Sequence, residues 1–107
     1  METPSSRYLK EMAKGNRNFE IKIFNLLLNE LPKEYNSYQK AIITKNFYWA
    51  FEIVRKINHK IVLFEMWEAQ SLLEKHEEAL ITGELKHHKE FQNIINRLLK
   101  FSPEQAN

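Results

Sequence analysis

One histidine lies where another molecule could reach it. His59 is part of the run of residues 50–64. If this run is helical, each residue turns by about 100° around the axis. The apolar residues of the run then form one narrow stripe: Ala50, Val54, Ile57, Ile61 and Phe64. His59 lies about 180° from the middle of that stripe. The run therefore predicts a helix that packs one face into a core and presents a titratable, nucleophilic imidazole on the other.

The same helical wheel predicts the neighbours of His59. Lys56 precedes it by one turn on the same face, and Arg55 and Lys60 are close, so each could supply positive charge near the imidazole. The other predicted neighbours are Tyr48, Glu52, Val62, Leu63 and Met66. The last three would be exposed apolar side chains, and soluble monomers seldom leave such clusters bare. The pattern predicts a partner-docking surface beside His59.

Simpler interpretations stand beside these. His59 can be a surface histidine without a task, which the residue pattern alone favours. Val62, Leu63 and Met66 can be buried against another helix or in self-association with a second copy. His76 lies on an apolar stripe, which is typical of a core or boundary histidine. Adjacent His87 and His88 would point about 100° apart on a helix, which is poor geometry for binding one metal ion.

The composition narrows the class of protein. The 107 residues allow a single domain, with its core over about residues 7–101. Without cysteine the chain has neither a disulfide nor a thiolate metal site. The net charge is +2, from 16 basic and 14 acidic residues that are interspersed, which argues against a nucleic-acid interface. There is no apolar run of about 20 residues and no signal-peptide pattern, so we expect a cytoplasmic protein without membrane contact.

Helical periodicity dominates the chain. A short helix is predicted over residues 7–14, capped by Ser5 or Ser6. A long helix is predicted over residues 18–44, capped by Asn18 and kinked at Pro32, with two separate helices as the lesser alternative.

Three further helices complete the prediction. The helix of His59 is expected from residue 47 to 66 or 67. A shift of the apolar stripe at residues 68–71 marks an uncertain break, and the next helix ends at Thr82-Gly83. The last begins near Leu85 and stops at Ser102-Pro103. Because the connections are short, we expect an all-α, antiparallel, up-down four-helix bundle with a short N-terminal helix across one end.

With these features the chain resembles the histidine-containing phosphotransfer (HPt) domain. Residues 8–19 are similar to the family's short first helix and glycine turn, and residues 26–32 to its long helix with an internal proline. His59-Lys60-Ile61 matches the start of the family's active-site motif. Leu73 and Leu80 correspond to apolar positions of the next helix. The resemblance covers residues 8–101 and implies the HPt fold.

The chain departs from the family pattern directly after the histidine. Val62 stands where the family has a lysine, and Leu63 stands where it has a small residue. The family also usually has a glycine near residues 68–70, which is missing here. Val62 cannot offset phosphoryl charge, so Lys56, Lys60 or Arg55 would have to do so. Leu63 would change the angle at which a partner docks.

The resemblance implies a phosphorelay carrier rather than an enzyme. His59 would accept a phosphoryl group from an aspartyl phosphate on a response-regulator receiver domain or hybrid histidine kinase, and donate it to another receiver. Mg²⁺ would belong to the receiver, so no cofactor or metal is expected on this chain. Two alternatives remain open: a pseudo-HPt module that docks without phosphotransfer, and a structural or oligomerising helical bundle.

Overall fold

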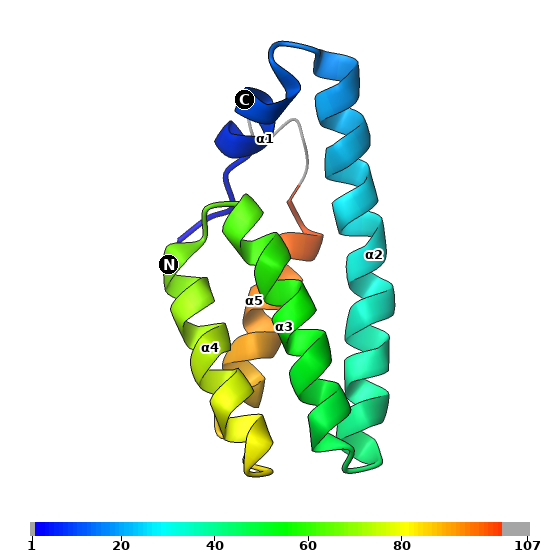
Figure 1. Ribbon diagram of the computed structural model, residues 1–107, viewed down its shortest axis with the longest axis vertical. Helices are drawn as coiled ribbons and strands as arrows, with labels where there is room; N and C mark the ends of the chain where they lie inside the picture. The colour runs from blue at the N-terminus through cyan, green and yellow to red at the C-terminus, as the bar shows by residue number, and fades with distance from the viewer. Residues whose placement is uncertain (1, 102–107) are drawn as a thin grey trace.

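The computed structural model describes residues 2–101 as five α-helices, with no strand among them (Figure 1). They are α1 (Arg7–Ala13), α2 (Arg17–Ile43), α3 (Phe47–Leu63), α4 (Trp67–Ile81) and α5 (His88–Leu99). The prediction of an all-α protein is confirmed. The predicted stop at Ser102-Pro103 lies outside the described residues. Within residues 2–101, none of the helices combines the length and apolarity that crossing a bilayer requires.

The four longer helices run side by side along the long axis of the molecule, and α1 lies across one end (Figure 1). α3 packs against both α2 and α4, and α5 packs against the same two helices. The described chain extends 44 × 24 × 19 Å. Figure 1 also shows that the α2–α3 turn and the α4–α5 connection lie together at the end opposite α1. There the aromatic ring of Phe47 lies 3.5 Å from the place a Cβ would take on Gly83.

The core of the molecule contains the stripe predicted on α3. Ala50, Val54, Ile57, Ile61 and Phe64 are all completely buried, which confirms this stripe. The other helices contribute further fully buried side chains, among them Leu9, Leu31, Tyr38, Leu73, Leu80, Phe91, Ile95 and Leu98. Burial of these apolar surfaces is the main stabilising contribution to the fold. It also fixes the rotation of α3 about its axis, and with it the direction of His59.

The start of α2 differs from the prediction. Asn16, not Asn18, is the N-cap, and its side chain accepts a hydrogen bond of 3.0 Å from the backbone N–H of Phe19. Asn18 lies within the first turn. α2 continues through Pro32 as one helix, so the alternative of two helices is wrong. A proline inside a helix lacks one N–H donor. Leu31 and Tyr38, on either side of Pro32, are both completely buried, so tertiary packing supports the helix before and after the proline.

Three helices end in the same way. After α2, α3 and α4 the residue beyond the C-cap adopts a positive φ: 57° at Lys45, 57° at Glu65 and 75° at Gly83. Backbone bonds from Asn46 to Ala41, from Met66 to Ile61 and from Glu84 to Ala79 close each end in a Schellman arrangement. Only the last of these carries the glycine that signals such an end. The predicted end of α3 at residue 66 or 67 is therefore wrong by about one turn.

Candidate functional site

His59 is exposed on α3, between two buried neighbours in the sequence, Asn58 and Lys60. Ile57 and Ile61, two residues to either side, are completely buried. The helix is therefore held by its opposite face, and the imidazole projects from a fixed backbone. This matches the exposure predicted for His59. The arrangement leaves a nucleophilic nitrogen accessible to a second molecule without any rearrangement of the core.

The positive charges around His59 are arranged differently from the prediction. Lys56 and Arg55 are exposed. Lys60 is buried, and its ammonium lies 3.2 Å from Glu30 Oε1 and 3.0 Å from Glu34 Oε1. Its charge is thus directed at α2 and neutralised there. The helical wheel could not show this, because it does not say which neighbouring helix carries carboxylates at that height.

The apolar side chains near His59 are less exposed than predicted. Met66 is completely buried, so the expectation that it is exposed is wrong. It follows the early end of α3, where the turn directs it into the core. Val62 and Leu63 are partly buried. Tyr48 is 69 % exposed, and Glu52 is exposed one turn later on α3.

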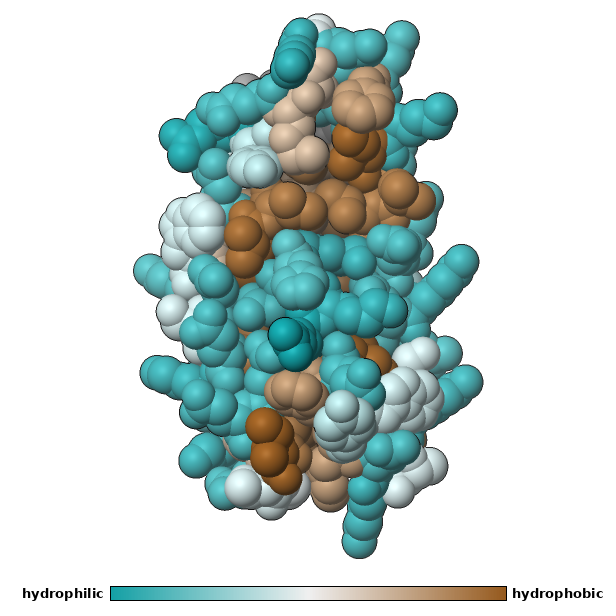
Figure 2. All heavy atoms as spheres, in the orientation of Figure 1, coloured by the Kyte–Doolittle hydropathy of each residue, from teal (hydrophilic) through white to brown (hydrophobic). Residues whose placement is uncertain are grey.

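Figure 2 shows one face of the molecule around α3. Apolar side chains gather toward the end that carries α1, and hydrophilic side chains cover the middle of this face. Phe19, Ile23 and Leu26 of α2 line a shallow hollow, and Leu26 is 61 % exposed. Val62 and Leu63 lie on the half of α3 nearest to α1. An apolar area at one end of α3 thus adjoins the polar middle of the helix.

Glu77 of α4 is a neighbour of His59 that the sequence did not reveal. Burial raises the pKa of the Glu77 carboxyl, while a hydrogen bond from Asn58 and the charges of Arg55 and His59 act against this rise. The bond from Asn58 Nδ2 to Glu77 Oε2 is long, at 3.5 Å. The pairing of α3 with α4 brings Asn58 and Glu77 together across 19 positions of sequence, so no local pattern could have indicated this contact.

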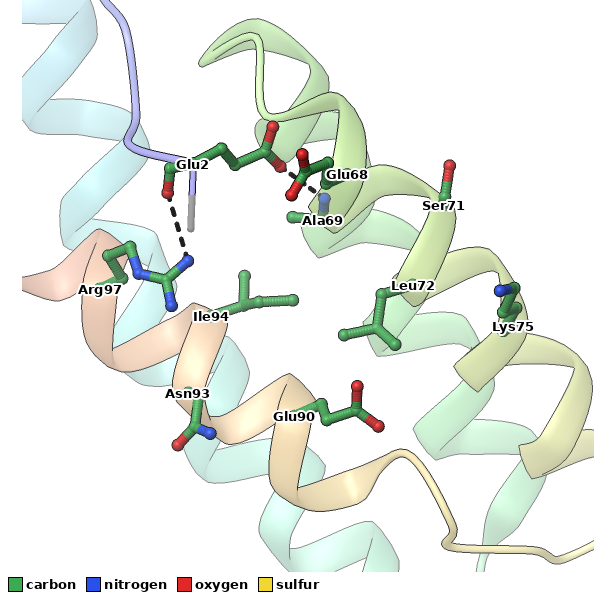
Figure 3. A pocket seen from close by; sticks show the side chains of 10 residues that line it. All are labelled: Glu2, Glu68, Ala69, Ser71, Leu72, Lys75, Glu90, Asn93, Ile94 and Arg97. Carbon is green, nitrogen blue, oxygen red and sulfur yellow. Dashed lines mark hydrogen bonds between the residues drawn. The ribbon is translucent and has the colours of Figure 1, made fainter.

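A separate groove of about 310 Å³ lies between α4 and α5 (Figure 3). Leu72 and Ile94 line its apolar part, and Glu2 closes one end. The Glu2 carboxylate accepts a hydrogen bond of 2.6 Å from the N–H of Ala69, in the first turn of α4. Its carbonyl oxygen accepts one of 3.3 Å from Arg97. Glu2 thus caps the N-terminus of α4, which the apolar side chain of its N-cap residue, Met66, cannot do. The groove contains none of the predicted site residues.

The histidines other than His59 meet at the opposite end from α1. His76 is completely buried, as predicted for a core histidine, and its Nε2 lies 2.8 Å from the Tyr38 hydroxyl. His88 Nδ1 lies 2.7 Å from the same hydroxyl. Within residues 2–101, no group of three or more His, Cys, Asp or Glu side chains has an arrangement that would hold a metal ion.

Comparison of the chain with protein-family models, with curated proteins and with solved structures found no match.

Proposed function

We propose that the chain is a histidine phosphocarrier with an HPt-like, up-down four-helix bundle. It accepts a phosphoryl group on His59 from the aspartyl phosphate of a receiver domain and donates it to another, in the cytoplasm. The observation that carries this proposal is the exposed imidazole in the middle of a helix whose opposite face is completely buried. The contacts of α3 and α5 with both α2 and α4 support the bundle.

The chemistry requires little of the carrier itself. A neutral imidazole nitrogen attacks phosphorus, the new P–N bond forms as the P–O bond to the aspartate breaks, and the aspartate leaves as a carboxylate. The proton on the other ring nitrogen is then free to pass to water. The receiver supplies Mg²⁺ and most of the groups that stabilise the transferred phosphoryl. An accessible ring on a rigid helix is the main contribution of this chain.

Lys56 and Arg55 supply the supporting charge in this proposal. Both are exposed and lie within one turn of His59, whereas the Lys60 ammonium is paired with Glu30 and Glu34. Arg55 also acts on Glu77, whose negative charge would oppose a phosphoryl group. The partner docks on Tyr48, Glu52, Val62 and Leu63. Because the middle of this face is polar and its end apolar, docking combines charge around His59 with apolar contact near α1.

A second candidate function is docking without phosphotransfer. It is favoured by two observations: Val62 occupies the position of the family's lysine, and Lys60 is already neutralised by α2. Such a pseudo-HPt module would bind a receiver or a kinase through the same surface. A structural or oligomerising bundle is the remaining alternative, and it requires the surface at Val62 and Leu63 to be covered by a second copy.

One experiment separates these functions. Receiver domains charged with acetyl phosphate and Mg²⁺ are incubated with the wild-type chain and with His59→Gln, and both receiver binding and phosphoryl transfer are measured. If the chain is a carrier, the phosphoryl group passes from the receiver to the wild type but not to His59→Gln, while both chains bind the receiver. If the chain is a docking module, the wild type and His59→Gln both bind the receiver and neither accepts a phosphoryl group. If neither chain binds and the wild type self-associates, the structural alternative is correct.

A further inference from the structure

Two of the four histidines hydrogen-bond to one tyrosine hydroxyl, and a third lies beside one of them. Tyr38 of α2 and His76 of α4 are completely buried, and His88 is the first residue of α5. The Tyr38 ring lies 5.9 Å from that of His76 and stacks on that of His88 at 5.6 Å. The His87 ring lies edge-on to His76 at 6.5 Å. The two hydrogen bonds of the hydroxyl therefore join three helices.

Counting donors and acceptors shows which nitrogen of His76 and of His88 carries a proton. The hydroxyl has one proton, so it donates to one imidazole and accepts from the other. His76 Nδ1 is buried and has no hydrogen-bond partner in the described structure. A buried N–H without an acceptor is more costly than a bare lone pair. We therefore assign the proton of His76 to Nε2, which donates to Tyr38, and the hydroxyl donates to His88 Nδ1.

A further proton on either imidazole destabilises this arrangement. On His76 it would have to go to Nδ1, which would place a cation in a fully buried position without an acceptor. On His88 it would go to Nδ1 and remove the acceptor of the Tyr38 hydroxyl. The oxygen of Tyr38 could still accept from both imidazoles, but its own proton would then lose its acceptor. Only with both imidazoles neutral is the Tyr38 hydroxyl proton bonded and the site free of buried charge.

Among the residues that the structure describes, the charged groups around Tyr38, His76 and His88 form no ion pair with either of these two imidazoles. Tyr35 is the titratable neighbour on α2, and within residues 2–101 no carboxylate hydrogen-bonds to His76 or His88. Glu90 of α5 lies 3.5 Å from His87 Nδ1 and is largely exposed. Four further charged groups, from α4 and the connection after it, line a hollow beside His87: Lys75, Glu78, Glu84 and Lys86. On α3, Lys60 is paired with α2, and the charges of Arg55 and His59 act on Glu77.

The shifts in pKa agree with the neutral imidazoles that the hydrogen bonds indicate. Burial lowers the pKa of His76 to about 4, and the neighbouring His88 and His87 contribute to this. Burial also lowers the pKa of His88. Burial raises the pKa of Tyr38, with a contribution from Tyr35, so the hydroxyl keeps its proton.

We propose that Tyr38, His76 and His88 form an acid-sensitive latch, which holds the start of α5 on α2 and α4 while both imidazoles are neutral and releases it on acidification. Release separates α5 from the core and exposes its apolar face, which consists of Phe91, Ile94, Ile95 and Leu98. The proposal is independent of phosphotransfer, because His59 lies on another helix and takes no part in the latch.

The direction of the pH dependence follows from the lowered pKa. In the open form His76 would titrate near its ordinary pKa of 6.5, and in the closed form near 4. The latch is therefore fully effective above pH 6.5 and weakens as the pH falls from 6.5 toward 4. At pH 5, His76 alone shifts the equilibrium toward opening by roughly 30-fold relative to pH 8.

Amide hydrogen exchange of the full chain at pH 7.5 and 5.0, corrected for intrinsic exchange rates, tests this proposal. Expected in the wild type is a loss of protection in α5 of at least tenfold, larger than the loss in α3. His59→Gln should show the same loss, because it removes a histidine outside the latch. The double variant His76→Gln/His88→Asn keeps one donor and one acceptor at the positions of Nε2 and Nδ1 without a titrating ring. In it, α5 should remain protected at pH 5.0.

Two results would overturn the latch: equal losses of protection in α5 and α3 of the wild type, or an unchanged loss in the double variant. If the double variant does not fold, NMR titration of the wild-type imidazoles decides. The latch requires His76 to remain neutral at pH 5.5 while α5 is protected. An ordinary titration of His76 with α5 still protected would refute it.

Discussion

Lys56 and Lys60 lie four residues apart on α3 but have different surroundings. Lys56 is exposed beside His59, whereas the Lys60 ammonium is paired with two carboxylates of α2. The sequence placed both among the charges that support His59. For Lys60 this prediction was wrong, because its side chain points toward α2 and not toward His59. A side chain at the edge of the apolar stripe can turn toward either neighbouring helix.

Two substitutions separate these roles. We expect Lys56→Gln to slow phosphoryl transfer to His59 by roughly two- to five-fold, as for the loss of one exposed charge, with unchanged stability. Lys60→Gln should leave the transfer rate of the folded protein unchanged. It should lower the free energy of unfolding by about 1–3 kcal/mol, because Glu34 would remain half-buried and unpaired. Transfer rates and urea unfolding of both variants provide the measurement, and the opposite pattern would assign the supporting charge to Lys60.

At the scale of the helices, the sequence predicted the number and order of the elements and most of their bounds. It was wrong about the start of the last helix, expected near Leu85, because α5 begins at His88. Its errors occurred where local signals were duplicated or missing. Two asparagines precede the apolar stripe of α2, and the structure uses Asn16 as the cap. At the end of α3 no glycine marks the left-handed residue, because Glu65 adopts that conformation, with its carboxylate 3.1 Å from Arg7.

The cap of α2 can be tested with a matched pair. Asn16→Ala removes the side-chain acceptor of the Phe19 N–H, so the free energy of unfolding should fall by about 1 kcal/mol. Asn18→Ala, two residues later in the exposed first turn, should change it by less than about 0.5 kcal/mol. Urea denaturation of both variants at pH 7.5 gives the comparison. Equal effects, or a larger effect at Asn18, would contradict the assignment of the cap.

At the scale of the whole molecule, one core positions both the exposed His59 and the buried Tyr38 cluster. The apolar stripe of α3 was predictable because its period is local. The meeting of Tyr38, His76 and His88 was not, because it depends on how α2, α4 and α5 are arranged around one another. The same holds for Glu77 beside His59. Single residues on a stripe can be placed from sequence, whereas pairs that join helices need the tertiary structure.

The two faces of α3 should therefore respond differently to truncation. Ile57 is completely buried, and we expect Ile57→Ala to lower the free energy of unfolding by about 2–5 kcal/mol, a large part of the total for a domain of this size. His59→Ala, two residues later on the exposed face, should change it by less than about 0.5 kcal/mol. Thermal or urea unfolding measures both, and a strong effect of His59→Ala would mean that this histidine supports the fold.

The position of a phosphoryl group on the chain shows whether His59 is a phosphoacceptor. The wild-type protein is incubated with charged receiver domains, and the phosphorylated residue is identified by ³¹P NMR and by mass spectrometry at alkaline pH, where phosphohistidine is stable. If the chain is a phosphocarrier, it carries one phosphoryl group, on His59, which is lost on brief acid treatment. An unphosphorylated chain beside receivers that bind it, or a phosphoryl group on any other residue, would rule out phosphotransfer through His59.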